Sequence, residues 1–146
     1  MLAFAAEPAR GVTAAEVAKI LQDASYSAKI GKAGDGTPRI DSNMGGVDVV
    51  MDFYDCEADR CGSLQLTTGI DLEKGSTYQV INKFNSEYRY GSAYLDAAMD
   101  PFIEYDFEVV NTDHAAYIRS QIELWEEVLG YFIKVIESGD SKPATK

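Results

Sequence analysis

The sequence predicts an α+β fold in which helices pack against an antiparallel sheet, in the order α-β-β-β-β-α-β-β-α. Three segments carry apolar residues at three- and four-residue steps, which is typical of amphipathic helices. Between them lie short stretches in which apolar and polar residues alternate, which is typical of strands. These stretches come in runs between the helices, and that arrangement favours an antiparallel sheet over a parallel one.

The length and composition predict one globular domain. The chain has 146 residues, of which 46% are hydrophobic and 25% are charged. Its net charge is −11, and residues 41–146 contribute −12 of it because residues 1–40 sum to +1. Such a field repels phosphate backbones and anionic lipid surfaces, so we expect no nucleic-acid partner. The charge suits a basic protein partner, or it serves solubility alone.

The N-terminus resembles the end of a secretory signal. Residues 1–11 read MLAFAAEPARG, in which Ala3-Phe4-Ala5 forms an A-x-A pattern before the chain turns polar. We interpret residues 1–11 as the remnant of a signal peptide or as a flexible tail, residues 12–138 as one domain, and residues 139–146 as a disordered tail. No run approaches the roughly 20 apolar residues that a membrane span needs.

The first helix is predicted over residues 13–24 because Thr13 and Glu16 form a capping box before an apolar pattern with helical spacing. Residues 26–30 alternate and predict a strand. After the turn signal GKAGDGTP, residues 38–42 predict a second strand, which ends before Gly45-Gly46.

A hairpin is predicted over residues 47–70, with residues 57–60 as its loop. Facing residues then have numbers that sum to 117. The apolar face pairs Val47–Ile70, Val49–Thr68, Met51–Leu66 and Phe53–Leu64. On the other face Cys56 meets Cys61, within bridging distance for a disulfide.

Cys56 and Cys61 are best explained as a structural disulfide across this hairpin, with two free thiols as the alternative. Two cysteines are too few for a structural zinc site, and the one histidine, His114, lies far away in sequence. A redox C-x-x-C spacing is also missing. A disulfide requires an oxidising compartment, so we expect an exported protein. With free thiols the alternative is a cytoplasmic one.

The remaining elements are a helix over residues 76–88, strands over residues 92–96 and 101–110, and a long amphipathic helix that ends at Gly139. This last helix is expected to begin at a cap formed by Thr112 or Asp113. Its apolar side chains are Ile118, Ile122, Trp125, Leu129, Phe132, Ile133 and Ile136.

No catalytic or metal-binding constellation is recognisable. The acidic run over residues 48–59 lacks the ligand spacing of a calcium loop, and the strand alternation spreads it along a solvated face. The sequence offers no nucleophile–base pair, phosphate-binding loop or dinucleotide motif. We therefore expect no enzyme, no cofactor and no bound metal.

A cluster of polar and aromatic side chains surrounds the end of the second helix. Asn82, Asn85 and Arg89 follow i, i+3, i+7 spacing, which puts them on one helical face, and Tyr90 and Tyr94 follow. Such a group either ties the helix to neighbouring backbone or forms a recognition patch. These five residues are the candidate binding patch.

Five segments resemble the YbjN-domain family of bacterial sensory transduction regulators: DGTPRIDS, DFYDCEADRCGSLQLTTGIDL, INKFNSEYRYGSAYLD, DPFIEYDFEV and LWEEVL. The most specific block includes Asn82, Asn85, Arg89, Gly91 and Tyr94. Phe84 stands where the family frequently has tryptophan. The resemblance implies a fold similar to type III secretion chaperones, which often dimerise and bind extended segments of partners. It implies no catalytic residues. Exported members of the family resemble this chain in their signal peptide and hairpin cysteines, which implies a periplasmic location.

The resulting expectation is a non-enzymatic binding or regulatory protein that acts through protein–protein contacts. Its partner would be an unidentified protein, basic or presented as an extended peptide, and a homodimer is a further option. The alternative is a small-molecule sensing domain that uses Asn82, Asn85, Arg89 and Tyr94 as the polar groups of a pocket.

Overall fold

The computed structural model describes residues 10–109 and 113–139, and it confirms the predicted fold class and element order. The elements are α1 (Ala14–Asp23), β1 (Lys29–Lys32), β2 (Pro38–Met44), β3 (Val47–Glu57), β4 (Arg60–Gly69), α2 (Tyr78–Glu87), β5 (Ser92–Leu95), β6 (Pro101–Glu108) and α3 (His114–Ser138). Most of the two predicted tails and the alternative cap at Thr112 lie outside the described residues.

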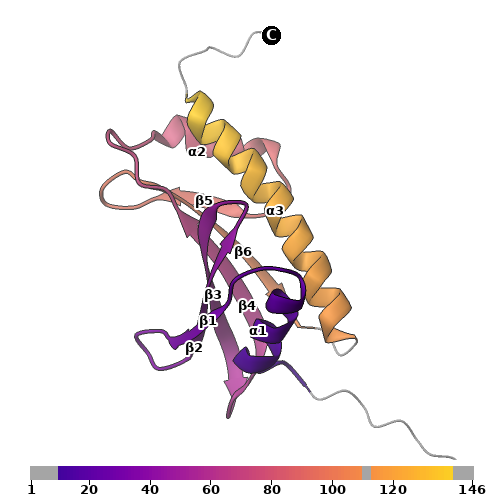
Figure 1. Ribbon diagram of the computed structural model, residues 1–146. Helices are drawn as coiled ribbons and strands as arrows, with labels where there is room; N and C mark the ends of the chain where they lie inside the picture. Colours follow the sequence, from indigo (N-terminus) through magenta and orange to yellow (C-terminus); the bar gives the residue numbers. More distant parts are fainter. Residues whose placement is uncertain (1–9, 110–112, 140–146) are drawn as a thin grey trace, which may run out of the picture.

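The strands form one antiparallel sheet in the order β1-β2-β3-β4-β6-β5. The helix α3 runs diagonally along this sheet, with α1 near its N-terminal end and α2 beside its C-terminal half (Figure 1). Since the inward residues of the central strands are buried and most of the outward ones are partly or fully exposed, the helices cover one face of the sheet. The other face has no helix over it in the described part of the chain.

The core lies between the sheet and α3. Its largest fully buried side chains include Trp125 and Phe132 of α3, Phe53 of β3 and Phe84 of α2. Fully burying a side chain of this kind stabilises a fold by about 1.5–3 kcal/mol. The predicted apolar stripe of the last helix therefore provides the cover for the sheet.

The hairpin register is confirmed, because Met51 pairs with Leu66, Phe53 with Leu64, and Cys56 with Cys61. The predicted four-residue loop is wrong. Glu57 and Arg60 still pair, so only residues 58–59 form the turn. A two-residue turn requires a positive φ, and Ala58 adopts a φ of 56° there.

Other element boundaries differ from the predictions by a few residues. The first strand begins at Lys29 instead of Tyr26, because the Tyr26 N–H still donates to the Leu21 carbonyl and so closes the end of α1. The second strand, predicted to end at residue 42, continues to Met44. The capping box at Thr13 is confirmed, as Thr13 accepts from the Glu16 N–H and Glu16 accepts from the Thr13 N–H.

Candidate functional site

The end of α2 separates the residues of the predicted binding patch. The helix ends at Glu87, and Tyr88 already has extended φ and ψ angles of −114° and 140°. Arg89 therefore does not share a helical face with Asn82 and Asn85. Within residues 10–109 and 113–139, Asn82 is exposed and makes no side-chain hydrogen bond.

Asn85 bonds to the edge of the sheet. Its amide oxygen accepts from the Ala93 N–H at 2.9 Å, and its amide nitrogen donates to the Ala93 carbonyl at 3.1 Å. The side chain thus occupies the place of a further strand on β5, which is an edge strand. Unpaired strand edges attract other chains, and Asn85 closes this one while it ties α2 to the sheet.

Tyr94 lies on the uncovered face of the sheet, away from the helices. Its hydroxyl donates to Glu104 at 3.0 Å, and its ring stacks on Phe102 with centroids 5.4 Å apart. Burial and the hydrogen bond to the Glu104 carboxylate raise the pKa of Tyr94 to about 12. The structure therefore puts Tyr94 and Asn85 in different local environments.

Arg89 and Tyr90 line a groove between the end of α2 and α3. The cavity measures about 450 Å³. The residues that line it are Glu87, Tyr88, Arg89, Tyr90, Leu124, Glu127, Val128 and Tyr131, and we call this set the α2–α3 groove. Most of the lining is apolar or aromatic, and 39% of Tyr131 and of Tyr90 is exposed.

A ladder of aromatic rings forms one wall of the groove. Phe84 stacks on Tyr88 at 5.0 Å between centroids, and Tyr88 stacks on Tyr131 at 4.9 Å. Phe84 is fully buried and meets Phe132 edge to face, so the ladder starts in the core. Because its inner end is fixed by packing, the outer rings are held in place before any ligand arrives.

The charged residues that line the groove are two glutamates and Arg89, and the Lys134 ammonium lies 6.0 Å from the centroid of the Tyr131 ring. Glu87 and Glu127 lie at its rim. The Arg89 guanidinium stands over the Tyr90 ring, 5.1 Å from the centroid, in a cation–π contact. The charged residues Glu87, Arg89 and Glu127 are thus exposed at the border, whereas Val128 is buried at the floor.

A second, smaller hollow of about 280 Å³ lies on the other side of Arg89 and Tyr90. It reaches the margin of the uncovered sheet face at Glu104 and Asp106, and Tyr105, which donates to Gln121 of α3, lines it from the covered face. Burial raises the pKa of Tyr105 above its ordinary value. Arg89 and Tyr90 therefore form the ridge that divides two hollows.

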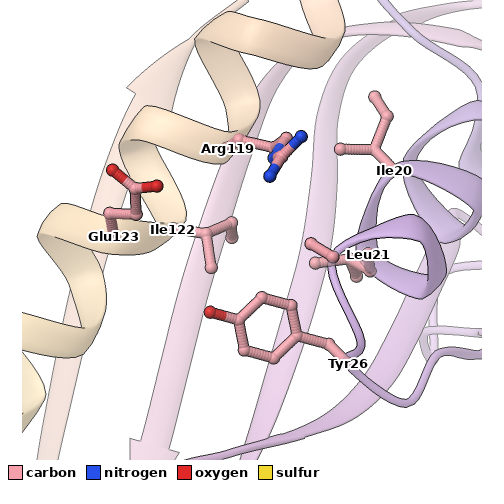
Figure 2. A pocket seen from close by; sticks show the side chains of 7 residues that line it. Ile20, Leu21, Tyr26, Arg119, Ile122 and Glu123 are labelled. Atoms are coloured by element: carbon pink, nitrogen blue, oxygen red, sulfur yellow. The ribbon is translucent and has the colours of Figure 1, made fainter.

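A third cavity, about 170 Å³ in volume, separates α1 from α3. Figure 2 shows the Tyr26 ring between Leu21 of α1 and Ile122 of α3, with Arg119 reaching toward α1. Burial and the neighbouring Glu126 carboxylate raise the pKa of Tyr26 to about 12. This cavity is small, and its lining belongs mainly to the contact between the two helices.

The disulfide between Cys56 and Cys61 is present in the structure, at the tip of the β3–β4 hairpin. Cys61 also exchanges two backbone hydrogen bonds with Val12, at 3.0 and 2.9 Å, so the chain before α1 extends the sheet beyond the end of β6. Arg10 and Gly11, which the sequence analysis assigned to the tail, are therefore held against β4.

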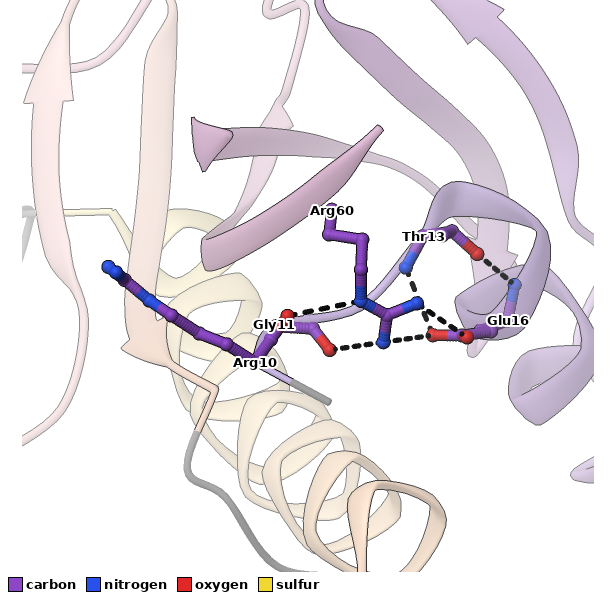
Figure 3. A network of polar contacts seen from close by, with 5 residues as sticks. All are labelled: Arg10, Gly11, Thr13, Glu16 and Arg60. Atoms are coloured by element: carbon purple, nitrogen blue, oxygen red, sulfur yellow. Dashed lines mark hydrogen bonds and ion pairs between the residues drawn. The ribbon is translucent and has the colours of Figure 1, made fainter. Parts of the chain in front are cut away.

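Arg60 fastens this N-terminal segment (Figure 3). It donates to the carbonyls of Arg10 and Gly11 at 3.1 and 2.8 Å, and it forms an ion pair with Glu16 at 3.0 Å. Partial burial by itself would raise the pKa of Glu16. The hydrogen bonds from Arg60 and from the Thr13 N–H outweigh it, so the pKa of Glu16 is lowered. This network holds α1 in place, and it has no free donor set for a ligand.

The arrangement supports non-covalent binding. Across the described ranges, no three His, Cys, Asp or Glu side chains are grouped so that they could hold a metal ion. In that same part of the chain, no helix is long and apolar enough to cross a membrane. The apolar α2–α3 groove is the feature best suited to a ligand.

The α3 wall of the groove was not among the predicted site residues. Leu124, Val128 and Tyr131 follow i, i+4, i+7 spacing, so they form a second apolar stripe beside the one that faces the sheet. A stripe wider than core packing requires was the signal that could have found them.

Comparison with known proteins gives one match. Searches of curated proteins and of solved structures found no similar protein, so the likeness to type III secretion chaperones stays a prediction. The model of one family, described as "Putative bacterial sensory transduction regulator", matches residues 13–138. The match extends from the start of α1 to the end of α3 and so includes the whole sheet. The chain therefore belongs to the YbjN family.

Proposed function

We propose that this protein is a non-catalytic regulator that binds a segment of another protein in the α2–α3 groove. The single observation that carries the proposal is the groove itself, an apolar cavity of about 450 Å³ whose wall is the stacked pair Tyr88 and Tyr131. Exposed apolar surface with a polar rim is typical of sites where proteins bind one another. The family description as a regulator supports a binding role.

The shape and chemistry of the groove favour a protein segment over a small metabolite. A small-molecule site usually has a few polar groups that converge on the ligand. Here the floor is formed by Leu124, Val128 and tyrosine rings, while the charged groups stay at the rim. One bulky apolar side chain of a partner would fill such a floor and act as the anchor of the interface.

The negative charge of the chain favours basic residues on either side of the anchor in the partner segment. With a net charge of −11 and with Glu87 and Glu127 at the rim, the groove attracts lysine or arginine residues beside the anchor. The occupant we propose is a bulky apolar residue flanked by basic ones. A second copy of this chain brings the same negative charge, and nucleic acid is repelled for the same reason.

We also propose that the protein acts in an oxidising compartment outside the cytoplasm. A disulfide at the hairpin tip is stable in an oxidising environment, and the A-x-A pattern near the N-terminus is typical of exported proteins. We place the protein and its partner in the periplasm. The partner is then a periplasmic or envelope protein that exposes a basic and apolar segment.

A photo-crosslinking experiment in the cells that produce the protein tests the proposal. A photoreactive phenylalanine replaces Tyr131 inside the groove, or Tyr78 as the matched control, since Tyr78 is an exposed tyrosine on α2 outside the groove. The proposal predicts one recurrent adduct from position 131, attached beside lysine or arginine in the partner and lost when Leu124→Glu is added. Identical adducts from both positions, a crosslink to a second copy, or no adduct would overturn it.

A further inference from the structure

The uncovered face of the sheet has a composition unlike that of an ordinary solvated face. The outward side chains of neighbouring strands are in register across it, so that Arg39, Asp52, Gln65 and Asp106 follow one another from β2 to β6. These residues come from strands that run side by side opposite the helices (Figure 1). The face is therefore one continuous surface.

Carboxylates dominate this surface. Arg39 and Asp52 neutralise one another through two hydrogen bonds of 2.6 and 3.2 Å. Among the described residues, Glu104, Asp106 and Glu108 have no cationic nitrogen within 4.0 Å. Cations at its margins include Lys29, which pairs across strands with Asp41, and Arg89, which borders the smaller hollow. The surface is thus left with an excess of negative charge.

Aromatic rings lie among these carboxylates. Tyr54 is 46% exposed and Tyr94 is 40% exposed, and the Tyr94 ring is stacked on Phe102. A tyrosine face attracts a guanidinium or ammonium group, and a neighbouring carboxylate adds a charge-assisted hydrogen bond. Rings and carboxylates side by side are therefore suited to arginine and lysine side chains.

Hydrogen bonds fix the polar groups in position. Gln65 donates to Asp106 at 3.1 Å and to Glu104 at 3.5 Å, while Tyr94 donates to the other oxygen of Glu104. The smaller hollow of about 280 Å³ opens beside Glu104 and Asp106 and offers room for a side chain. An incoming cation thus meets acceptors that are already oriented, which lowers the entropic cost of binding.

We infer that the uncovered sheet face is a second interaction surface, which binds a basic, extended segment of another protein. Charge complementarity selects this occupant, since arginine and lysine satisfy both the carboxylates and the tyrosine faces. A second copy of the chain would bring carboxylates against carboxylates. The inference rests on the sheet face alone and holds whether or not the α2–α3 groove is occupied.

An alternating arginine–glycine peptide with a fluorescent label is the probe, titrated at low salt and followed by anisotropy. The variant Glu104→Gln/Asp106→Asn should weaken binding roughly fivefold or more. The control Glu123→Gln/Glu137→Gln removes the same charge from exposed residues of α3 and should change the affinity less than about twofold. Equal losses in both variants would show unspecific attraction and overturn the inference.

A charge-neutral variant provides the second arm. Tyr54→Ala keeps every carboxylate and removes one exposed ring. It should lower the affinity for the peptide about twofold to threefold, because a cation–π contact is lost. Leu124→Glu in the groove should leave the affinity for this peptide undiminished, which separates the two surfaces. Unchanged affinity in Tyr54→Ala, or peptide-induced NMR shifts outside the sheet face, would contradict the inference. Urea unfolding of each variant checks that the fold is intact.

Discussion

The side-chain amide of Asn85 hydrogen-bonds both backbone polar groups of Ala93 and so takes the place of a missing strand at the edge of the sheet. A single residue thereby fixes the position of α2 against β5. The neighbouring end of α2 carries one wall of the α2–α3 groove. The geometry of the groove therefore depends on this contact, although Asn85 does not line it.

Asn85→Ala should lower the free energy of unfolding by about 1–2 kcal/mol, because it removes the side-chain hydrogen bonds to both partly buried backbone groups of Ala93. The matched control is Asn82→Ala on the same helix. The Asn82 side chain is exposed, so its removal should change the free energy of unfolding by less than about 0.5 kcal/mol. Urea unfolding compares the two. Equal losses, or no loss at Asn85, would contradict the assigned role.

Gly11 is required where the N-terminal segment runs close beside β4. Its φ is +70°, and an added Cβ would lie 2.5 Å from the Cys61 carbonyl oxygen. Gly36 has a similar φ of +86° with nothing near its Cβ position, so Gly36→Ala measures the backbone cost alone, about 1–2 kcal/mol. We expect Gly11→Ala to cost clearly more in urea unfolding. It should also speed amide exchange at Val12 and Cys61, and equal behaviour of the two variants would contradict this.

The disulfide closes a short loop, so its expected contribution is modest. With a sequence separation of 5 residues between Cys56 and Cys61, the chain-entropy relation gives about 2 kcal/mol. Cys56→Ala/Cys61→Ala should lose that amount in urea unfolding. Dithiothreitol should destabilise the natural protein by a similar amount and leave the double variant unchanged. A natural protein that is insensitive to the reductant would show that the bond contributes nothing to stability.

The compartment has a separate test. Intact mass after alkylation, with and without prior reduction, should show that Cys56 and Cys61 are blocked in protein alkylated directly in the cells that produce it. Two thiols that react without reduction would contradict the export proposal and favour the cytoplasm.

Tyr94 should make stability depend on pH in the alkaline range. Its pKa in the folded chain is about 12, against an ordinary value of 10.0. Because the unfolded chain releases this proton first, the free energy of unfolding should fall as the pH rises from about 10 toward 12. Glu104→Gln should bring the pKa of Tyr94 down only in part, since burial also raises it. Tyrosinate absorbance, with Tyr94→Phe as the reference, measures the change.

The sequence was sufficient for much of the fold. Side chains alternate with a period of two along a strand, so one register alone could bury Met51, Phe53, Leu64 and Leu66 together. The turn was less determined, since Glu57 and Arg60 fit either a paired or a looped arrangement. The alternation of side chains therefore predicted which residues pair, but it did not determine the length of the turn.

The candidate site was harder to predict because its residues meet only in three dimensions. The spacing of Asn82, Asn85 and Arg89 suggested one face, but α2 ends before Arg89. Pairing of Asn85 with Ala93 depends on where β5 lies, and a propensity argument has no access to that. Tyr131 reaches Tyr88 across a contact between two helices more than 40 positions apart in the chain.

Affinity measured at the groove shows whether the partner binds there. The segment identified by crosslinking at position 131 is synthesised as a labelled peptide and titrated against the natural chain and against Leu124→Glu. We expect saturable binding that is weakened about tenfold or more by the added charge at the groove floor. The same affinity for both proteins would show that the groove has no role in binding.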